Sequence, residues 1–269
     1  MSLLPLALKA VTTAAVVVSA ALVAERTRPF LAAMVLSLPV SSGPAYVMLV
    51  LDHDAPFIAA ASLSSLSANV SIVPAAVAYA LFARKGHGLA VCFAAMIGAW
   101  LATALLVGLT DWTLIGALVL NALVFAAGIA ATWSWRRAEM TRPPRPRWYD
   151  IPLRAALVVT LVVLVVTVSE YIGPTVTGIA ALFPTSYSSF VLLMHGRLGG
   201  AVVAAAIING LVMLIGFTGF LTAIHVFAAA GQTWTGIAVG LAVPVVWSLL
   251  VYAISRIIPT AQDADASGR

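Results

Sequence analysis

Residues 38–44 read Leu-Pro-Val-Ser-Ser-Gly-Pro, and residues 183–189 read Phe-Pro-Thr-Ser-Tyr-Ser-Ser. Each segment lies inside a long apolar run, and Pro184 follows Pro39 by 145 positions (184 − 39). A period of this length is too long for a solenoid and, in an apolar chain, indicates the duplicated halves of a membrane transporter. The same offset aligns further residues without a gap: Leu8-Lys9-Ala10 with Leu153-Arg154-Ala155, Glu25 with Glu170, Pro29 with Pro174, and Ser41 with Ser186.

The composition is that of an integral membrane protein. Hydrophobic residues make up 62% of the chain and charged residues 9%, and the mean hydropathy is +1.09. Soluble domains carry about 25% charged residues. The apolar runs are continuous rather than alternating, which predicts an all-α helical bundle and not an outer-membrane barrel. The net charge of +5 comes from cations between the apolar runs, so we interpret it as a topology signal and expect no nucleic-acid partner.

Charges, glycines and prolines divide the chain into nine expected membrane spans. Each approaches or exceeds the roughly 20 residues that a helix needs to cross a bilayer. The third and eighth are long enough to be tilted, kinked or broken. The expected spans are Leu6 to Ala24, Phe30 to Leu51, Phe57 to Ala83, Gly88 to Leu109, Trp112 to Trp135, Ile151 to Glu170, Thr175 to Met194, Gly200 to Val226, and Trp234 to Ser255.

The charges between the spans predict the orientation. Basic loops fall on one side throughout and acidic loops on the other, so the positive-inside rule places the N-terminus outside and the C-terminus inside. The first span resembles a cleavable signal peptide in its small residues, but it aligns with the sixth span, and we expect it to be retained. The basic groups are Arg26 with Arg28, Arg84 with Lys85, Arg136 to Arg147, Arg197, and Arg256; the acidic groups are Asp52 with Asp54, Asp111, and Glu170.

Five spans separate the starts of the two copies, and an odd number means that the copies cross the membrane in opposite directions. The sequence therefore predicts an inverted 4+4 repeat with the fifth span as a connecting helix. The expected divisions are a first repeat at 1–110, a connecting helix with a basic proline-rich cytoplasmic linker at 111–150, a second repeat at 151–258, and a cytoplasmic tail at 259–269.

The two proline segments are the candidate binding site. Each proline removes a backbone donor inside a span, and the hydroxyls that follow can begin a new helix. Two half-helix N-termini would then face each other near the midplane and favour an anion or a carboxylate. The alternative is that the two prolines only kink their transmembrane helices and that no ligand binds there. We expect substrate contacts from Pro39, Ser41, Ser42, Gly43, Pro184, Thr185, Ser186, Tyr187, Ser189, Asn69 and Asn209.

For two carboxylates and two amides, the sequence allows both a functional and a structural role. Glu25 and Glu170 each precede a matched proline by four residues, so they are candidates for coupling or gating carboxylates, or else interfacial helix-end charges. Asn69 and Asn209 are polar amides within apolar spans and could line a cavity or only bond a neighbouring helix. Asn121 fits the second role.

Around Phe183-Pro184-Thr185, over about thirty residues, the chain resembles the small GlpM-like inner-membrane proteins. These carry a Phe-Pro-Thr-Phe turn followed by a histidine in an apolar helix. Here Ser186 stands at the second Phe, and His195 lies about one turn beyond the corresponding histidine position. The resemblance implies an inner-membrane protein linked to envelope polysaccharide production.

We therefore expect a multi-pass protein of the bacterial inner membrane that works as a secondary transporter. The expected substrate is a small anionic or carboxylate-bearing solute, with H⁺ or Na⁺ as the candidate coupling ion. The chain carries no phosphate-binding loop and no metal-ligand spacing, so we expect no enzyme activity, cofactor or metal. Membrane lipids are expected partners, and a homodimer stays open. The alternatives are an ion channel and a non-transporting accessory protein of envelope assembly.

Overall fold

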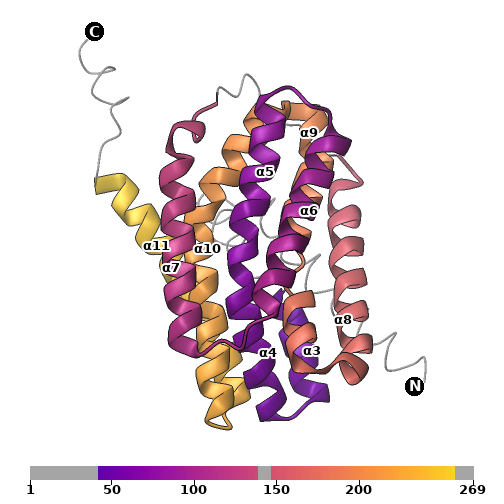
Figure 1. The fold of residues 1–269 in the computed structure, drawn as a ribbon, viewed down its shortest axis with the longest axis vertical. Coiled ribbons are helices and arrows are strands. Elements are labelled where there is room, and N and C mark those ends of the chain that lie inside the picture. The colour runs from indigo at the N-terminus through magenta and orange to yellow at the C-terminus, as the bar shows by residue number, and fades with distance from the viewer. Residues whose placement is uncertain (1–41, 139–146, 258–269) are drawn as a thin grey trace.

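The computed structural model describes residues 42–138 and 147–257, and every regular element within these ranges is a helix (Figure 1). The predicted first span, most of the second, the middle of the basic linker and the C-terminal tail lie outside the described residues. Glu25, Pro39 and Ser41 lie outside them as well.

The described helices form one elongated bundle (Figure 1). Six of them are long and apolar enough to cross a membrane: Ala55–Arg84, Leu89–Gly108, Leu114–Ala131, Asp150–Ala180, Gly200–Ala229 and Thr233–Ile254. The protein is therefore a multi-pass membrane protein. The elements are α3 (Ser42–Asp52), α4 (Ala55–Ala68), the 3₁₀ turn η1 (Asn69–Ser71), α5 (Ile72–Arg84), α6 (Leu89–Gly108), α7 (Leu114–Ala131), η2 (Trp133–Trp135), α8 (Asp150–Ala180), α9 (Thr185–Leu198), α10 (Gly200–Ala229) and α11 (Thr233–Ile257).

Two helix starts follow from capping residues in the sequence. Asp54 precedes α4 and accepts a hydrogen bond from the Phe57 N–H at 3.0 Å. Thr113 precedes α7 and accepts one from the Gly116 N–H at 3.1 Å. Each side chain satisfies a backbone donor that the first helical turn leaves without a partner.

The predicted third and eighth spans differ in their regularity. The third narrows to a 3₁₀ turn at η1, just before Pro74, whose missing N–H cannot bond the Val70 carbonyl. The eighth, α10, is continuous from Gly200 to Ala229 in spite of its glycines. Those glycines serve close packing on α11, because a Cβ on Gly216 would lie 2.9 Å from Trp247 and one on Gly219 would lie 2.5 Å from Val243.

The chain bends sharply within α8. Gly173 has φ 71° and ψ 173°, a backbone conformation that glycine adopts without strain. Pro174 follows and starts a short helical segment, 174–180, which turns back into the bundle (Figure 1). The helical pattern ends at Ala180, and α9 begins only at Thr185. The break predicted in the seventh span at Pro184 is therefore confirmed.

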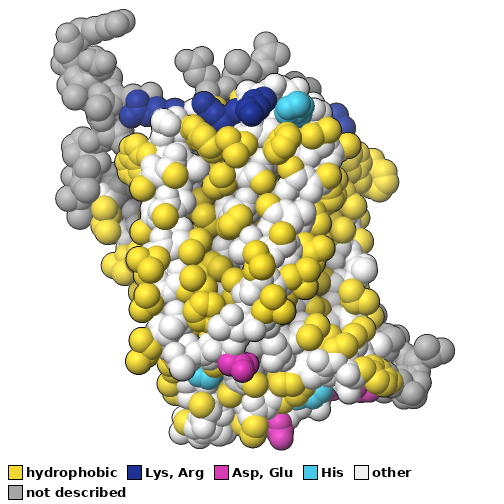
Figure 2. All heavy atoms as spheres, viewed as in Figure 1, with side chains coloured by type: hydrophobic (Ala, Val, Ile, Leu, Met, Phe, Trp, Pro, Cys, Tyr) yellow, Lys and Arg dark blue, Asp and Glu magenta, His cyan; other side chains and the backbone are white. Residues whose placement is uncertain are grey.

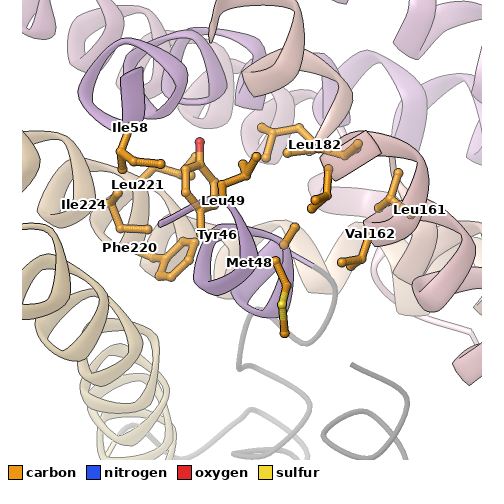
Figure 3. Packing of buried hydrophobic residues seen from close by; sticks show 14 of the residues in the cluster. Tyr46, Met48, Leu49, Ile58, Leu161, Val162, Leu182, Phe220, Leu221 and Ile224 are labelled. Atoms are coloured by element: carbon orange, nitrogen blue, oxygen red, sulfur yellow. The ribbon is translucent and has the colours of Figure 1, made fainter. Parts of the chain in front are cut away.

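Two buried clusters of apolar residues fill the bundle, one around α3 and one around α9. In the α3 cluster, Tyr46 and Leu49 lie between α10 and α8 (Figure 3). In the α9 cluster, Val191 packs with Tyr79 of α5 and Met96 of α6. Figure 1 places α3 and α9 in opposite halves of the bundle, and each contributes to a different core.

The charges lie at the two ends of the bundle. On the face shown in Figure 2, lysine and arginine gather at one end, and aspartate and glutamate at the other. We call the end where α5 and α9 finish the basic end, and the end where α3 and α6 finish the acidic end. A broad apolar band separates them (Figure 2), as expected for a protein that crosses a bilayer.

Candidate functional site

Helix α9 and the described part of α3 run in opposite directions from the middle of the bundle (Figure 1). The described part of α3 runs from Ser42 to Asp52 at the acidic end, and α9 runs from Thr185 to Leu198 at the basic end. Ser42 lies close to the break before α9, because its hydroxyl donates to the Ala181 carbonyl at 3.2 Å. Ala181 directly follows the short re-entrant segment, so this hydrogen bond joins α3 to the predicted break at Pro184.

Two backbone donors in the first turn of α9 have no partner among the described residues. The N-cap is Pro184, which offers no side-chain cap. The Thr185 N–H donates to the Phe183 carbonyl at 2.6 Å and the Ser188 N–H to the Pro184 carbonyl at 2.8 Å. Between them, the N–H groups of Ser186 and Tyr187 donate to no carbonyl of the described residues. A helix start with free N–H groups favours an anion.

A cavity of about 90 Å³ lies at these helix starts. Five of the residues predicted to contact a substrate line it: Ser42, Asn69, Pro184, Ser186 and Tyr187. They come from α3, from η1, from the break before α9 and from the first turn of α9. The structure thus brings together segments that are 145 positions apart in the chain (187 − 42).

The rest of the wall is apolar. Trp100 of α6 and Leu214 and Phe217 of α10 face the same cavity. None of the described residues that line it carries a charge. Sequence reasoning missed these three residues, because nothing in a long apolar span distinguishes a cavity-lining side chain from one that faces lipid.

Asn69 is held by two other spans. Its Nδ2 donates to Asn121 Oδ1 at 2.9 Å and to Thr218 Oγ1 at 3.1 Å. Asn121 Nδ2 in turn donates to the carbonyls of Leu66 and Ala117. The prediction that Asn121 bonds a neighbouring helix is confirmed, and Asn69 does this while also lining the cavity.

Other predicted site residues lie away from the cavity. The Thr185 and Ser189 hydroxyls donate to backbone carbonyls of Phe183 and Ser186. Asn209 is exposed on α10 and exchanges hydrogen bonds with Arg136, whose Nε lies 2.9 Å from Asn209 Oδ1. Gly43 is buried within α3, and Glu170 is exposed near the Gly173 bend.

Polar contacts close both ends of the bundle around the half-helices. At the basic end, Arg197 of α9 pairs with Asp150 of α8 through two hydrogen bonds of 2.6 and 2.8 Å. The buried Tyr79 hydroxyl lies 2.7 Å from His195 Nδ1. Beside them, hydrogen bonds from Arg147 and Arg197 lower the pKa of the Tyr149 phenol.

On the acidic side of the cavity, the contacts join α3 and α4 to α8. Tyr46 of α3 lies 2.6 Å from Ser65 of α4, and the Ser65 hydroxyl donates to the Gly178 carbonyl of the re-entrant segment at 2.7 Å. His53 Nε2 lies 2.8 Å from Ser169 Oγ. The Ser65–Gly178 and His53–Ser169 pairings join residues more than a hundred positions apart, so no local sequence signal predicts them.

Comparison with known proteins gives no further assignment. No protein family model matches the chain, and neither a curated protein nor a solved structure is significantly similar to it. The resemblance to GlpM-like proteins therefore stays an expectation from sequence, and the function has to be argued from the cavity.

Proposed function

We propose that the protein is a secondary transporter that moves a small anionic or carboxylate-bearing solute by alternating access. The observation that carries this proposal is the cavity at the start of α9, beside the described part of α3, which runs from there in the opposite direction. Interrupted spans that meet at mid-depth are the usual substrate sites of secondary transporters, because their free backbone groups face a cavity instead of lipid.

The packing supports an inverted repeat. The proposed equivalents are α3 with α9, α4 and α5 with α10, and α6 with α11. The packed pairs follow this scheme: α5 packs on α6 as α10 packs on α11, and α9 touches α6 as α3 touches α11. Two arrangements of such copies have similar energies, which is the physical basis for inward-open and outward-open states.

The charge distribution supports the orientation. The positive-inside rule places the basic end in the cytoplasm and the acidic end outside. In this orientation the six candidate spans fit a nine-span chain. The first span lies before the described region, α3 is the described part of the second, and the seventh is divided between the re-entrant segment and α9. A bacterial inner membrane is the proposed location.

The end contacts fit the role of gates in this scheme. The Asp150–Arg197 pair holds α9 to α8 at the basic end, and the Ser65 bridge holds α3 and α4 to the re-entrant segment on the acidic side of the cavity. Each transport state would break one set of contacts and keep the other. Glu170, exposed at the acidic end, remains a candidate for proton coupling.

The first test is transport by the full chain in proteoliposomes, measured as solute-induced currents on a solid-supported membrane. The panel holds small carboxylates and inorganic anions, with and without a pH gradient. We expect a saturable transient current that falls about tenfold in Ser186→Ala, because a hydrogen bond to a charged ligand contributes about 1.5–3 kcal/mol. Ser189→Ala is the matched control, since the Ser189 hydroxyl bonds within α9 and lies outside the cavity.

Three other results would contradict the proposal. Single-channel currents without saturable counterflow would indicate a channel built on the same half-helices. Equal currents in both serine variants would place transport elsewhere in the molecule. Silence across the panel in folded protein would favour the accessory role in envelope assembly.

A further inference from the structure

We infer that the cavity takes a two- or three-carbon 2-hydroxy monocarboxylate, with its carboxylate at the start of α9 and its hydroxyl on Asn69. This inference rests on the proposed function for the transport of the solute. The binding chemistry follows from the residues that line the cavity.

The carboxylate end follows from the donors at the cavity. The N–H groups of Ser186 and Tyr187, which bond no carbonyl of the described residues, lie with the Ser186 hydroxyl at the start of α9, and both residues line the cavity. Two adjacent N–H groups at a helix start can bind the two oxygens of one carboxylate, and the helix dipole favours its negative charge. The described lining residues offer no acidic side chain that would repel this charge.

The position of the solute hydroxyl is inferred from the side-chain oxygen of Asn69. Asn121 uses its Nδ2 on two carbonyls, so its Oδ1 must accept from Asn69 Nδ2. This network fixes the orientation of the Asn69 amide. Asn69 Oδ1 accepts no hydrogen bond from a described residue, although Asn69 is only 3% exposed and lines the cavity. An acceptor that faces a cavity can accept from a donor inside it, and a solute hydroxyl is such a donor.

The size and the body of the solute follow from the remaining wall. The cavity of about 90 Å³ is smaller than the roughly 150 Å³ cavity that holds benzene, a molecule of six carbon atoms. A solute of about five or six non-hydrogen atoms is therefore the upper limit. Trp100, Leu214 and Phe217 line the rest of the cavity. The part of the solute that faces them should therefore be apolar.

The same walls exclude close relatives of this solute. Glycine has the shape of glycolate with an ammonium group in place of the hydroxyl. Because the described lining holds no carboxylate, that ammonium would be desolvated without a counter-charge, beside a positive helix end. A dicarboxylate would place its second charge on the apolar wall.

The test is isothermal titration of the full chain in nanodiscs with sodium salts of glycolate, acetate and nitrate, and with glycine. We expect glycolate to bind about tenfold more tightly than acetate, because acetate leaves the Asn69 oxygen without a donor. Glycine and nitrate should bind at least tenfold more weakly than glycolate. This ranking needs no variant, so it does not depend on the folding of one.

Variants assign the two ends of the solute. Ser186→Ala should weaken glycolate and acetate by the same factor. Asn69→Leu should remove the preference for glycolate over acetate. Thr218→Val is the matched control: it removes one partner of Asn69 Nδ2 and leaves Oδ1 in place, so the preference for glycolate should persist.

Failure of this inference is distinct from failure of the transporter. Equal affinities for glycolate and acetate, or tighter binding of glycine or nitrate, overturn the substrate class even if the protein transports another anion. Preferential binding of glycolate without any current or counterflow keeps the substrate class and overturns transport. A glycolate preference that Thr218→Val removes as fully as Asn69→Leu overturns the role of the Asn69 oxygen.

Discussion

At the scale of single residues, Gly178 is the position where a side chain has least room. A Cβ on Gly178 would lie 2.1 Å from the Ala61 carbonyl oxygen, so Gly178→Ala must push the re-entrant segment off α4. We expect it to lower the free energy of unfolding by about 1–3 kcal/mol, measured as a shift of the thermal unfolding midpoint in detergent.

Gly98 provides the matched control for this prediction. It lies in α6, and nothing comes within 4 Å of a Cβ built there. Gly98→Ala should therefore be neutral or stabilising by about 0.5–1 kcal/mol, because alanine is the better helix former. Equal destabilisation by both changes would show that the close approach of α4 to the re-entrant segment contributes nothing.

At the scale of elements, the Asp150–Arg197 pair predicts how α9 is held at the basic end. Asp150→Asn removes the charge that Arg197 contacts through two hydrogen bonds. We expect α9 to loosen and the cavity to open towards the basic end. The measurement is the rate at which a charged thiol reagent, added on that side, labels Ser186→Cys in a Cys92→Ala background; we expect it to rise about tenfold.

Two variants define this effect. The exchange Asp150→Arg with Arg197→Asp restores the pair with reversed charges and should return the labelling rate towards that of the parent. Arg136→Gln is a control at the same end, since the Arg136 side chain contacts Asn209 and not α9. An unchanged rate in Asp150→Asn would mean that the apolar packing around Val191 alone closes this end.

The elements also mark the limit of what the sequence predicts. The break before α9 was predictable because Pro184 removes a local backbone donor, and the starts of α4 and α7 because Asp54 and Thr113 cap their own helices. The location of Asn209 beside Arg136, away from the cavity, was not predictable. It depends on how α7 packs against α10, and the period of an apolar span does not reveal which face meets which helix.

At the scale of the whole molecule, the core around α9 explains why this short helix can persist inside an apolar bundle. It is too short to cross a bilayer, and an interrupted backbone in lipid would leave polar groups without partners. Here α9 contributes to a buried cluster, and the broken backbone before it faces the cavity. The break is therefore stabilised by the full bundle and not by its own sequence.

The orientation of this bundle is the last prediction, and single cysteines on either side of α6 test it. In a Cys92→Ala background, Lys85→Cys lies at the basic end and Asp111→Cys at the acidic end. By the positive-inside rule, an impermeant maleimide added to intact cells should label Asp111→Cys and spare Lys85→Cys until the membrane is opened. Labelling of Lys85→Cys alone would show that the protein has the opposite orientation in the membrane. It would place the Asp150–Arg197 pair outside, so that this contact would have to break in the outward-open state instead of the inward-open one.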